Sequence, residues 1–99
     1  MQNLNILVLS ANAEILKVIL RILNKRENWN ADGLDNFDNV LEKYQEKNFD
    51  VVIYDVGITA EKGAELHTEF QKSNADVKTI WHYGGGSGLL FNEIKSSIK

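Results

Sequence analysis

The residues that decide the fold are 49–55, which read F-D-V-V-I-Y-D. Val51 to Tyr54 form an apolar run without polar alternation, and a second such run, Ile6 to Leu9, lies near the N-terminus. Runs of this kind are typical of strands that are covered on both faces, as in a parallel sheet. We therefore predict two central strands, over residues 5–9 and 49–54.

Two further strands are predicted, over residues 77–83 and 29–34. The first carries Ile80, Trp81 and Tyr83, whereas the second is a weaker candidate because Asp32 and Gly33 interrupt it. Apolar residues at helical spacing lie between and after the strands. They predict helices over 14–25 (face Ile15, Ile19, Ile22, Leu23), 37–44 (Phe37, Val40, Leu41, Tyr44), 59–70 (N-cap Thr59; Leu66, Phe70) and 87–98 (N-cap Ser87; Leu90, Phe91, Ile94, Ile98).

Strands and helices thus alternate along the chain, which predicts an α/β fold with a parallel sheet. The 99 residues fit a single domain, 1–99. The net charge of -3 and the lack of a Lys/Arg cluster argue against a nucleic-acid partner. The chain has no cysteine and no apolar segment long enough for a signal peptide core or a membrane span, so we expect a cytoplasmic protein without a membrane partner.

In an open parallel sheet, ligands bind at the carboxyl ends of the strands. Four segments should meet at that edge: residues 10–12, 34–36, 55–57 and 83–88. Within them, Asp55 directly follows a predicted central strand, and residues 84–88 read G-G-G-S-G before the last predicted helix.

Residues 55–66 read D-V-G-I-T-A-E-K-G-A-E-L. Asp55 is followed by Ile58 and Thr59 at three and four positions, by Gly63 at eight and by Glu65-Leu66 at ten and eleven. This pattern resembles that of response-regulator receiver domains, which are similar to CheY. The resemblance implies a flavodoxin-like, three-layer sandwich with a sheet of about four strands in the order 2-1-3-4. It also implies that Asp55 is the counterpart of the phosphoacceptor.

The chain departs from the receiver pattern in the residues that support phosphorylation. Two acidic residues that hold Mg²⁺ usually follow the first strand, whereas this chain has Ser10 and Ala11, followed by Asn12. The Ser or Thr after the fourth strand is replaced by Tyr83 or Gly84, and the Lys of a fifth strand has no counterpart because the last strand-helix unit is shortened. These differences are typical of a degenerate receiver, or pseudo-receiver.

We therefore expect a stand-alone signalling domain of the two-component type that acts by protein-protein interaction without efficient phosphorylation, and not an enzyme. Its partner would be a histidine kinase, a phosphotransfer protein or an output protein. Asp55 would offer a weak Mg²⁺ site at best, and no other cofactor is expected. The residues expected around Asp55 are Ser10, Asn12, Gly57, Thr59 and Tyr83.

Two alternatives stay open. In the first, Asp55 is a working phosphoacceptor. In the second, backbone amides of Gly84, Gly85, Gly86 and Ser87 bind an anion at a helix N-terminus, as in a small phosphate-binding α/β protein. Each marker also has a plainer interpretation: Asp55 as a turn residue, the glycine run as a connector, and His67 and His82 as packing or surface residues.

The shortened C-terminal unit leaves the fourth strand at an exposed edge of the predicted sheet. Unprotected edges pair with other chains, and aromatic residues suit the cores of interfaces. We therefore expect Trp81, His82 and Tyr83 to line an interface with a partner or with a second copy of the chain.

Overall fold

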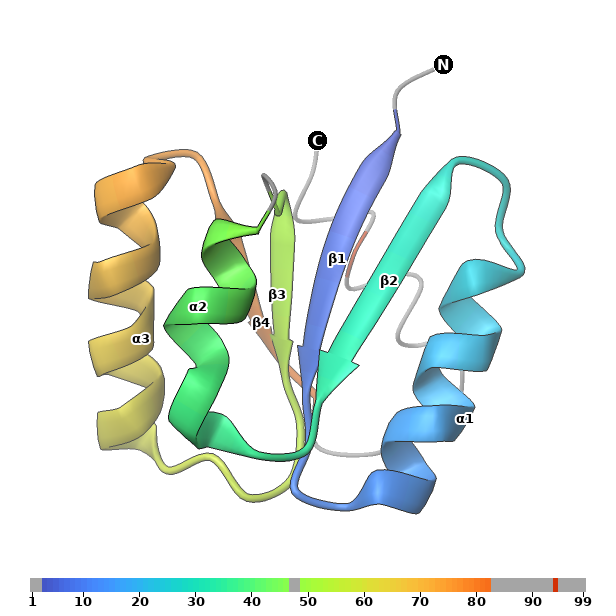
Figure 1. The fold of residues 1–99 in the computed structure, drawn as a ribbon, viewed down its shortest axis with the longest axis horizontal. Coiled ribbons are helices and arrows are strands. Elements are labelled where there is room, and N and C mark those ends of the chain that lie inside the picture. Colours follow the sequence, from blue (N-terminus) through green and yellow to red (C-terminus); the bar gives the residue numbers. More distant parts are fainter. Residues whose placement is uncertain (1–2, 47–48, 83–93, 95–99) are drawn as a thin grey trace.

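The computed structural model describes residues 3–46, 49–82 and 94, which form an α/β sandwich of three layers (Figure 1). The predicted alternation of strands and helices is confirmed for the described residues. In chain order the elements are β1 (Leu4–Leu9), α1 (Ala13–Asn24), β2 (Trp29–Leu34), the 3-10 turn η1 (Phe37–Asn39), α2 (Val40–Gln45), β3 (Val51–Tyr54), α3 (Ala60–Ser73) and β4 (Lys78–Trp81).

The sheet is parallel and its strand order is β2-β1-β3-β4, as predicted. The weak candidate strand over residues 29–34 is β2, and it pairs with β1 along its whole length. β4 is shorter than the predicted strand, and Tyr83 lies outside the described residues. Since all four strands run the same way, their carboxyl ends meet at one edge of the sheet.

The core has two parts because the central strands are covered on both faces. α1 lies on one face, and α2 and α3 lie on the other (Figure 1). Ile6, Val8, Val51 and Ile53 face α1 in one apolar cluster, which also contains Ile94. Their neighbours along β1 and β3 face α2 and α3 in the other: Leu7, Leu9, Val52 and Tyr54.

The predicted inner face of α1 is wrong in part. Ile19 and Leu23 are buried as expected, but Leu16 is buried too, whereas Ile15 is 42% exposed. The position of Gly33 in β2 explains this rotation, because a Cβ atom at Gly33 would lie 2.6 Å from Cδ1 of Leu16. The missing side chain therefore makes the space that Leu16 fills.

In α2, the predicted inward face holds for Val40 and Tyr44, which are buried, while Leu41 is 36% exposed. Tyr44 stacks on Phe70 of α3, with their ring centroids 4.3 Å apart. Burial, and after it the negative charge of Asp50, raises the pKa of Tyr44. The two helices on this face are therefore joined by an aromatic contact. Among the helices described, none is long and apolar enough to cross a membrane.

Gly63 lets α3 approach the sheet closely. A Cβ atom at this position would lie 2.4 Å from Cζ2 of Trp81 and 2.7 Å from Cη2 of the same ring. Alanine is favoured over glycine in a helix by about 1 kcal/mol, but overpacking a fixed contact costs about 1–3 kcal/mol. We expect Gly63→Ala to lower the free energy of unfolding by about 1 kcal/mol in urea denaturation.

The same substitution in a Trp81→Phe background is the control. Phenylalanine lacks the outer ring atoms that the new methyl group would meet, so the helix propensity of alanine should then dominate. Gly63→Ala should be neutral or stabilising in that background. An equal loss of stability in both backgrounds would contradict the proposed contact.

Candidate functional site

The carboxyl edge of the sheet is held together by backbone hydrogen bonds between its loops. The Ser10 amide donates to the carbonyl oxygen of Leu34 at 3.1 Å, and the Ala11 amide donates to that of Val56 at 2.8 Å. The Asp55 amide donates to the carbonyl oxygen of Leu9, also at 2.8 Å. The segments that follow β1, β2 and β3 therefore meet as predicted.

Asp55 lies directly after β3 and is partly buried. Its Oδ2 accepts a hydrogen bond from the Ser10 hydroxyl at 2.9 Å. Ser10 is fully buried, and its Oγ also lies 3.3 Å from the carbonyl oxygen of Asn12. The single hydroxyl proton is better placed for the shorter contact, so Ser10 holds the Asp55 carboxylate through a charge-assisted hydrogen bond.

Two other residues expected around Asp55 cap the helices that follow the adjoining loops. Asn12 caps α1, since its Oδ1 accepts from the amides of Glu14 and Ile15 at 3.0 Å each. Thr59 caps α3, as predicted, by accepting from the Lys62 amide at 3.1 Å. The Asn12 and Thr59 oxygens are thus already used by helix N-termini.

Gly57 is the residue that brings the two loops together. Its φ of +99° lies in the region that favours glycine. A Cβ atom here would also lie 2.4 Å from the Cβ of Ala11. The loop after β3 therefore packs directly on the loop after β1, with Ala11 where the receiver pattern has an acidic residue.

The charges around Asp55 decide what this edge of the sheet can do chemically. Ser10, Ala11 and Asn12 are neutral, and the described residues contain no group of three His, Cys, Asp or Glu side chains that could hold a metal ion. Lys78 starts β4 opposite Val51, four residues before Asp55, so it lies at the other end of the strands, about 13 Å away along the sheet. Asp55 thus has hydrogen-bond donors beside it, but these residues bring no second carboxylate and no cation.

Some of the site residues predicted after the fourth strand lie outside the described residues, and His82 lies within them. Tyr83 and the proposed anion-binding residues Gly84, Gly85, Gly86 and Ser87 lie outside the described residues. His82 continues the ladder, since its amide donates to the Tyr54 carbonyl oxygen at 2.8 Å, and its side chain is only 6% exposed. The His82 side chain shares the covered face of Ile80, because side chains alternate along a strand. The interface expected at Trp81, His82 and Tyr83 stays a prediction.

Trp81 is half-buried and lies on the other face of β4. Its ring packs on Tyr54, with centroids 4.7 Å apart and planes inclined by 59°. The Tyr54 hydroxyl donates to the Gly63 carbonyl oxygen at 3.0 Å, and burial raises the pKa of Tyr54. Trp81 is therefore fixed between β3 and α3 and keeps part of its surface accessible.

A groove of about 420 Å³, which was not predicted from the sequence, lies between α3 and β4. We call it the α3–β4 groove. Its walls include Ala60, Gly63, Ala64, His67, Thr79 and Trp81. The helical wall follows the spacing i, i+3, i+4, i+7, but three of its four members are Ala or Gly, so hydrophobic periodicity gave little signal.

Comparisons with known proteins found solved structures with a similar fold. No family model matches the chain, and no curated protein matches it. The response regulator TrrA of Thermotoga maritima, in its complex with the histidine kinase ThkA, is 20% identical over 100% of both chains, with a TM-score of 0.76. The chemotaxis protein CheY4 of Vibrio cholerae is 15% identical over 96% of this chain and 98% of its own, with a TM-score of 0.70.

A third similar structure is the response regulator domain of Thermotoga maritima CheB, which is 18% identical over 97% of this chain and 74% of its own, with a TM-score of 0.65. All three share the parallel α/β architecture expected from residues 55–66. The chain therefore has the CheY-like fold of response-regulator receiver domains.

Proposed function

We propose that this chain is a receiver-like signalling domain of the two-component type that acts through protein contacts without efficient phosphorylation of Asp55. The observation that carries the proposal is the 2.9 Å hydrogen bond from the Ser10 hydroxyl to the Asp55 carboxylate. A buried neutral side chain occupies the position beside Asp55 that carries an acidic residue in the receiver pattern. In this proposal the chain is a cytoplasmic binding module and not an enzyme.

Charge explains why this arrangement opposes phosphoryl transfer. A phosphoryl group on a side chain brings about two negative charges at neutral pH, and its transfer is catalysed mainly by cations placed to neutralise it. Mg²⁺ needs hard oxygen ligands and is usually held by one or two carboxylates. The described residues next to Asp55 offer neutral groups, and Ser10 must release its hydrogen bond before Oδ2 can react.

A protein partner is supported by the surface of α1 and by the comparison with TrrA. Ile15 and Val18 are exposed by 42% and 43%, and Lys17 and Arg21 lie beside them on the same helix. TrrA has been solved in complex with a histidine kinase. We therefore propose a partner of the kinase, phosphotransfer or output class for this chain.

A working phosphoacceptor is the second candidate function, and one observation favours it. Asp55 follows a central strand and is only partly buried, so a small donor can reach its carboxylate. TrrA has also been solved with Mg²⁺ and a beryllium fluoride. The two candidates differ in whether Asp55 responds to such a mimic of the phosphoryl group.

The first experiment exposes the chain to Mg²⁺ and beryllofluoride and follows its backbone amides by NMR. We expect the amides of Ala11, Val56 and Gly57 to keep their shifts, because these loops lack the charges that hold the complex. Asp55→Asn is the matched control, since its amide oxygen can still accept from Ser10. Shifts that appear in the natural chain and vanish in Asp55→Asn would overturn the proposal and establish the phosphoacceptor.

The second experiment supplies the acidic residues. The single variant is Ala11→Asp, at an exposed position. The double variant, Ser10→Asp with Ala11→Asp, has both acidic residues of the receiver pattern. We expect Mg²⁺ affinity, measured by calorimetry, to rise at least about tenfold in the double variant, which is about 1.4 kcal/mol, because two added carboxylates then face Asp55.

The control for net charge is Asn30→Asp with Gln45→Glu, at two exposed positions toward the other end of the strands. This variant should leave Mg²⁺ affinity unchanged. Because Ser10 is buried, urea denaturation is used to check that the double variant folds. Ala11→Asp alone should raise Mg²⁺ affinity by a smaller factor than the double variant. Equal affinity in all four proteins would mean that missing acids are not what limits the site.

A further inference from the structure

β2 forms one edge of the sheet, because β1 is its only neighbour among the described strands. In a parallel pair, alternate residues direct their amide and carbonyl groups toward the same side of the strand. The Leu34 carbonyl oxygen accepts from the Ser10 amide at 3.1 Å, so the even-numbered residues of β2 face β1. The backbone groups of the odd-numbered residues therefore point outward, away from the sheet: Trp29, Ala31 and Gly33.

An unpaired edge of this kind is a template for a strand of another chain. Two of the three outward positions are already used within the described residues. The Trp29 amide donates to the carbonyl oxygen of Arg26, in the turn before β2, at 3.2 Å. Both backbone groups of Ala31 are bonded to a side chain of α1. Gly33 is thus the outward position without a hydrogen-bond partner in the described part of the chain.

Asn24, the last residue of α1, makes the contact with Ala31. Its Oδ1 accepts from the Ala31 amide at 2.9 Å, and its Nδ2 donates to the Ala31 carbonyl oxygen at 3.1 Å. A carboxamide carries the same kinds of donor and acceptor as a peptide group. The Asn24 side chain therefore occupies the place where a residue of a further strand would pair with β2.

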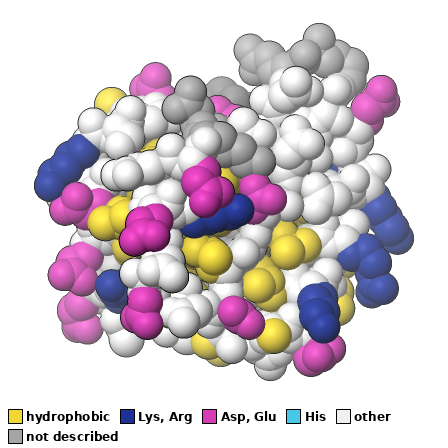
Figure 2. All heavy atoms as spheres, viewed as in Figure 1, with side chains coloured by type: hydrophobic (Ala, Val, Ile, Leu, Met, Phe, Trp, Pro, Cys, Tyr) yellow, Lys and Arg dark blue, Asp and Glu magenta, His cyan; other side chains and the backbone are white. Residues whose placement is uncertain are grey.

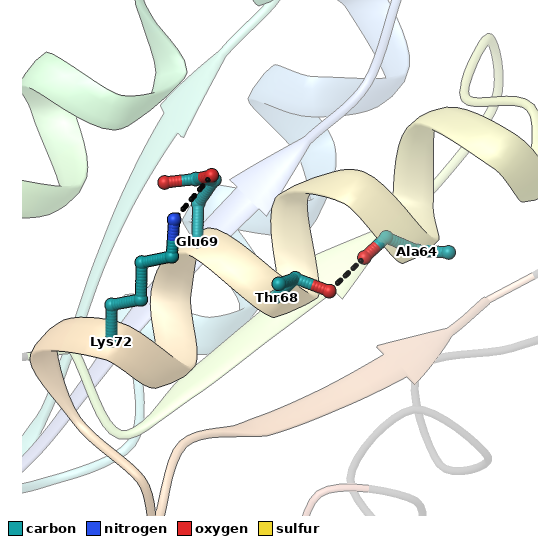
Figure 3. Close-up of polar contacts among 4 residues, drawn as sticks. All are labelled: Ala64, Thr68, Glu69 and Lys72. Carbon is teal, nitrogen blue, oxygen red and sulfur yellow. Dashed lines mark hydrogen bonds and ion pairs between the residues drawn. The ribbon is translucent and has the colours of Figure 1, made fainter.

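This contact differs from the local side-chain contacts of α3. There, the Thr68 hydroxyl donates to the Ala64 carbonyl oxygen at 3.1 Å, and Lys72 pairs with Glu69 at 3.0 Å (Figure 3). Both join residues about one turn apart in the same helix. The Asn24 contact instead joins a helix to a strand and uses both backbone groups of one residue, so its effect falls on the edge of the sheet.

We propose that Asn24 blocks self-association of this chain by closing the β2 edge to the β2 strand of a second copy. The inference goes beyond the proposed function and does not rest on it, since it concerns neither Asp55 nor a signalling partner. In a two-fold pairing centred on Ala31, the Ala31 residues of the two copies would exchange both of their backbone hydrogen bonds. Asn24 occupies the same donor and acceptor within one chain.

The sequence of β2 suits such a pairing once the carboxamide is removed. With Ala31 at the centre, Gly33 comes opposite Trp29 of the second copy, and Asn30 comes opposite Asp32 of the second copy. An aromatic residue across from an edge glycine is a favourable cross-strand pair. Asn30 is neutral, so the pairing brings no like charges directly opposite each other. A second copy is therefore the occupant against which this edge is closed.

The charges over α1 add a further barrier to this pairing. Lys and Arg side chains lie mainly over α1 in Figure 2, whereas Asp and Glu side chains gather over α2 and α3. A two-fold axis perpendicular to the sheet would place the α1 helices of both copies on the same face, where their positive charges repel. The experiment is therefore done at about 0.15 M salt, because charges more than about 8 Å apart are then largely screened.

The variant Asn24→Ala removes the carboxamide and leaves both backbone groups of Ala31 open. We expect sedimentation to show self-association at least about tenfold tighter than that of the natural chain. Hydrogen exchange of the Gly33 amide identifies the edge. It should be fast in the natural chain at every concentration, and in Asn24→Ala it should slow at least about tenfold as the concentration rises.

Asn30 tests the register of the pairing, because it would lie opposite Asp32 of the second copy. In the Asn24→Ala background, Asn30→Asp should weaken the dimer about threefold or more, and Asn30→Lys should tighten it by a similar factor. The controls for net charge are Gln45→Glu and Gln45→Lys, at an exposed position of α2, which should leave the dimer unchanged. Asn30→Ala alone keeps the Asn24 contact and should associate no more tightly than the natural chain.

An Asn24→Ala chain that associates no more tightly than the natural chain would overturn the inference. A dimer of this variant whose Gly33 amide stays fast, or whose strength ignores the charge at position 30, would also overturn it, because the copies would then meet elsewhere. Asn24 is exposed at the end of a helix, so alanine there leaves the core intact, and urea denaturation checks the folding of every variant. None of these results bears on Asp55, which beryllofluoride tests separately.

Discussion

The structure depends on the burial of β1 and β3 on both faces of the sheet. All four residues of β3 are at most 1% exposed, and each pairs with a residue of β1 that is equally covered. Backbone groups in such a position must find partners within the sheet, because water cannot reach them. The register Leu9 with Tyr54 follows, and it sets the Asp55 amide on the Leu9 carbonyl oxygen at 2.8 Å. The position of the candidate site is thus a consequence of the core.

The same constraint explains why the side chain of Ser10 lies beside Asp55. Ser10 follows β1 directly and is fully buried, so its side chain has little freedom and lies beside Asp55. A carboxylate in that position would face the Asp55 charge at close range and would need a cation to be tolerated. A hydroxyl instead donates a hydrogen bond to the Asp55 side chain at 2.9 Å.

Sequence reasoning was most successful where the physical signal is local and strong. The apolar runs identified β1 and β3, and Thr59 was identified as a helix cap from its place before α3. The inner face of α1 was partly misassigned because the helix is apolar around most of its circumference, so periodicity alone does not select Leu16 over Ile15. That choice depends on Gly33, which belongs to a different strand and only comes near α1 in the folded chain. For His82 the sequence left a packing role and an interface role open, because it does not show which face of the fourth strand is covered.

The α3–β4 groove escaped detection for a related reason, and its origin is informative about function. Grooves form where side chains are small, and small residues are the ones that carry little hydrophobic signal along the sequence. Gly63 gives Trp81 its place against α3, and Ala60 and Ala64 leave the space beside it open. A surface made in this way needs no change of charge at Asp55 to be available. The groove and the surroundings of Asp55 are physically independent, because the packing that forms the groove depends on side-chain size and the chemistry beside Asp55 depends on charge.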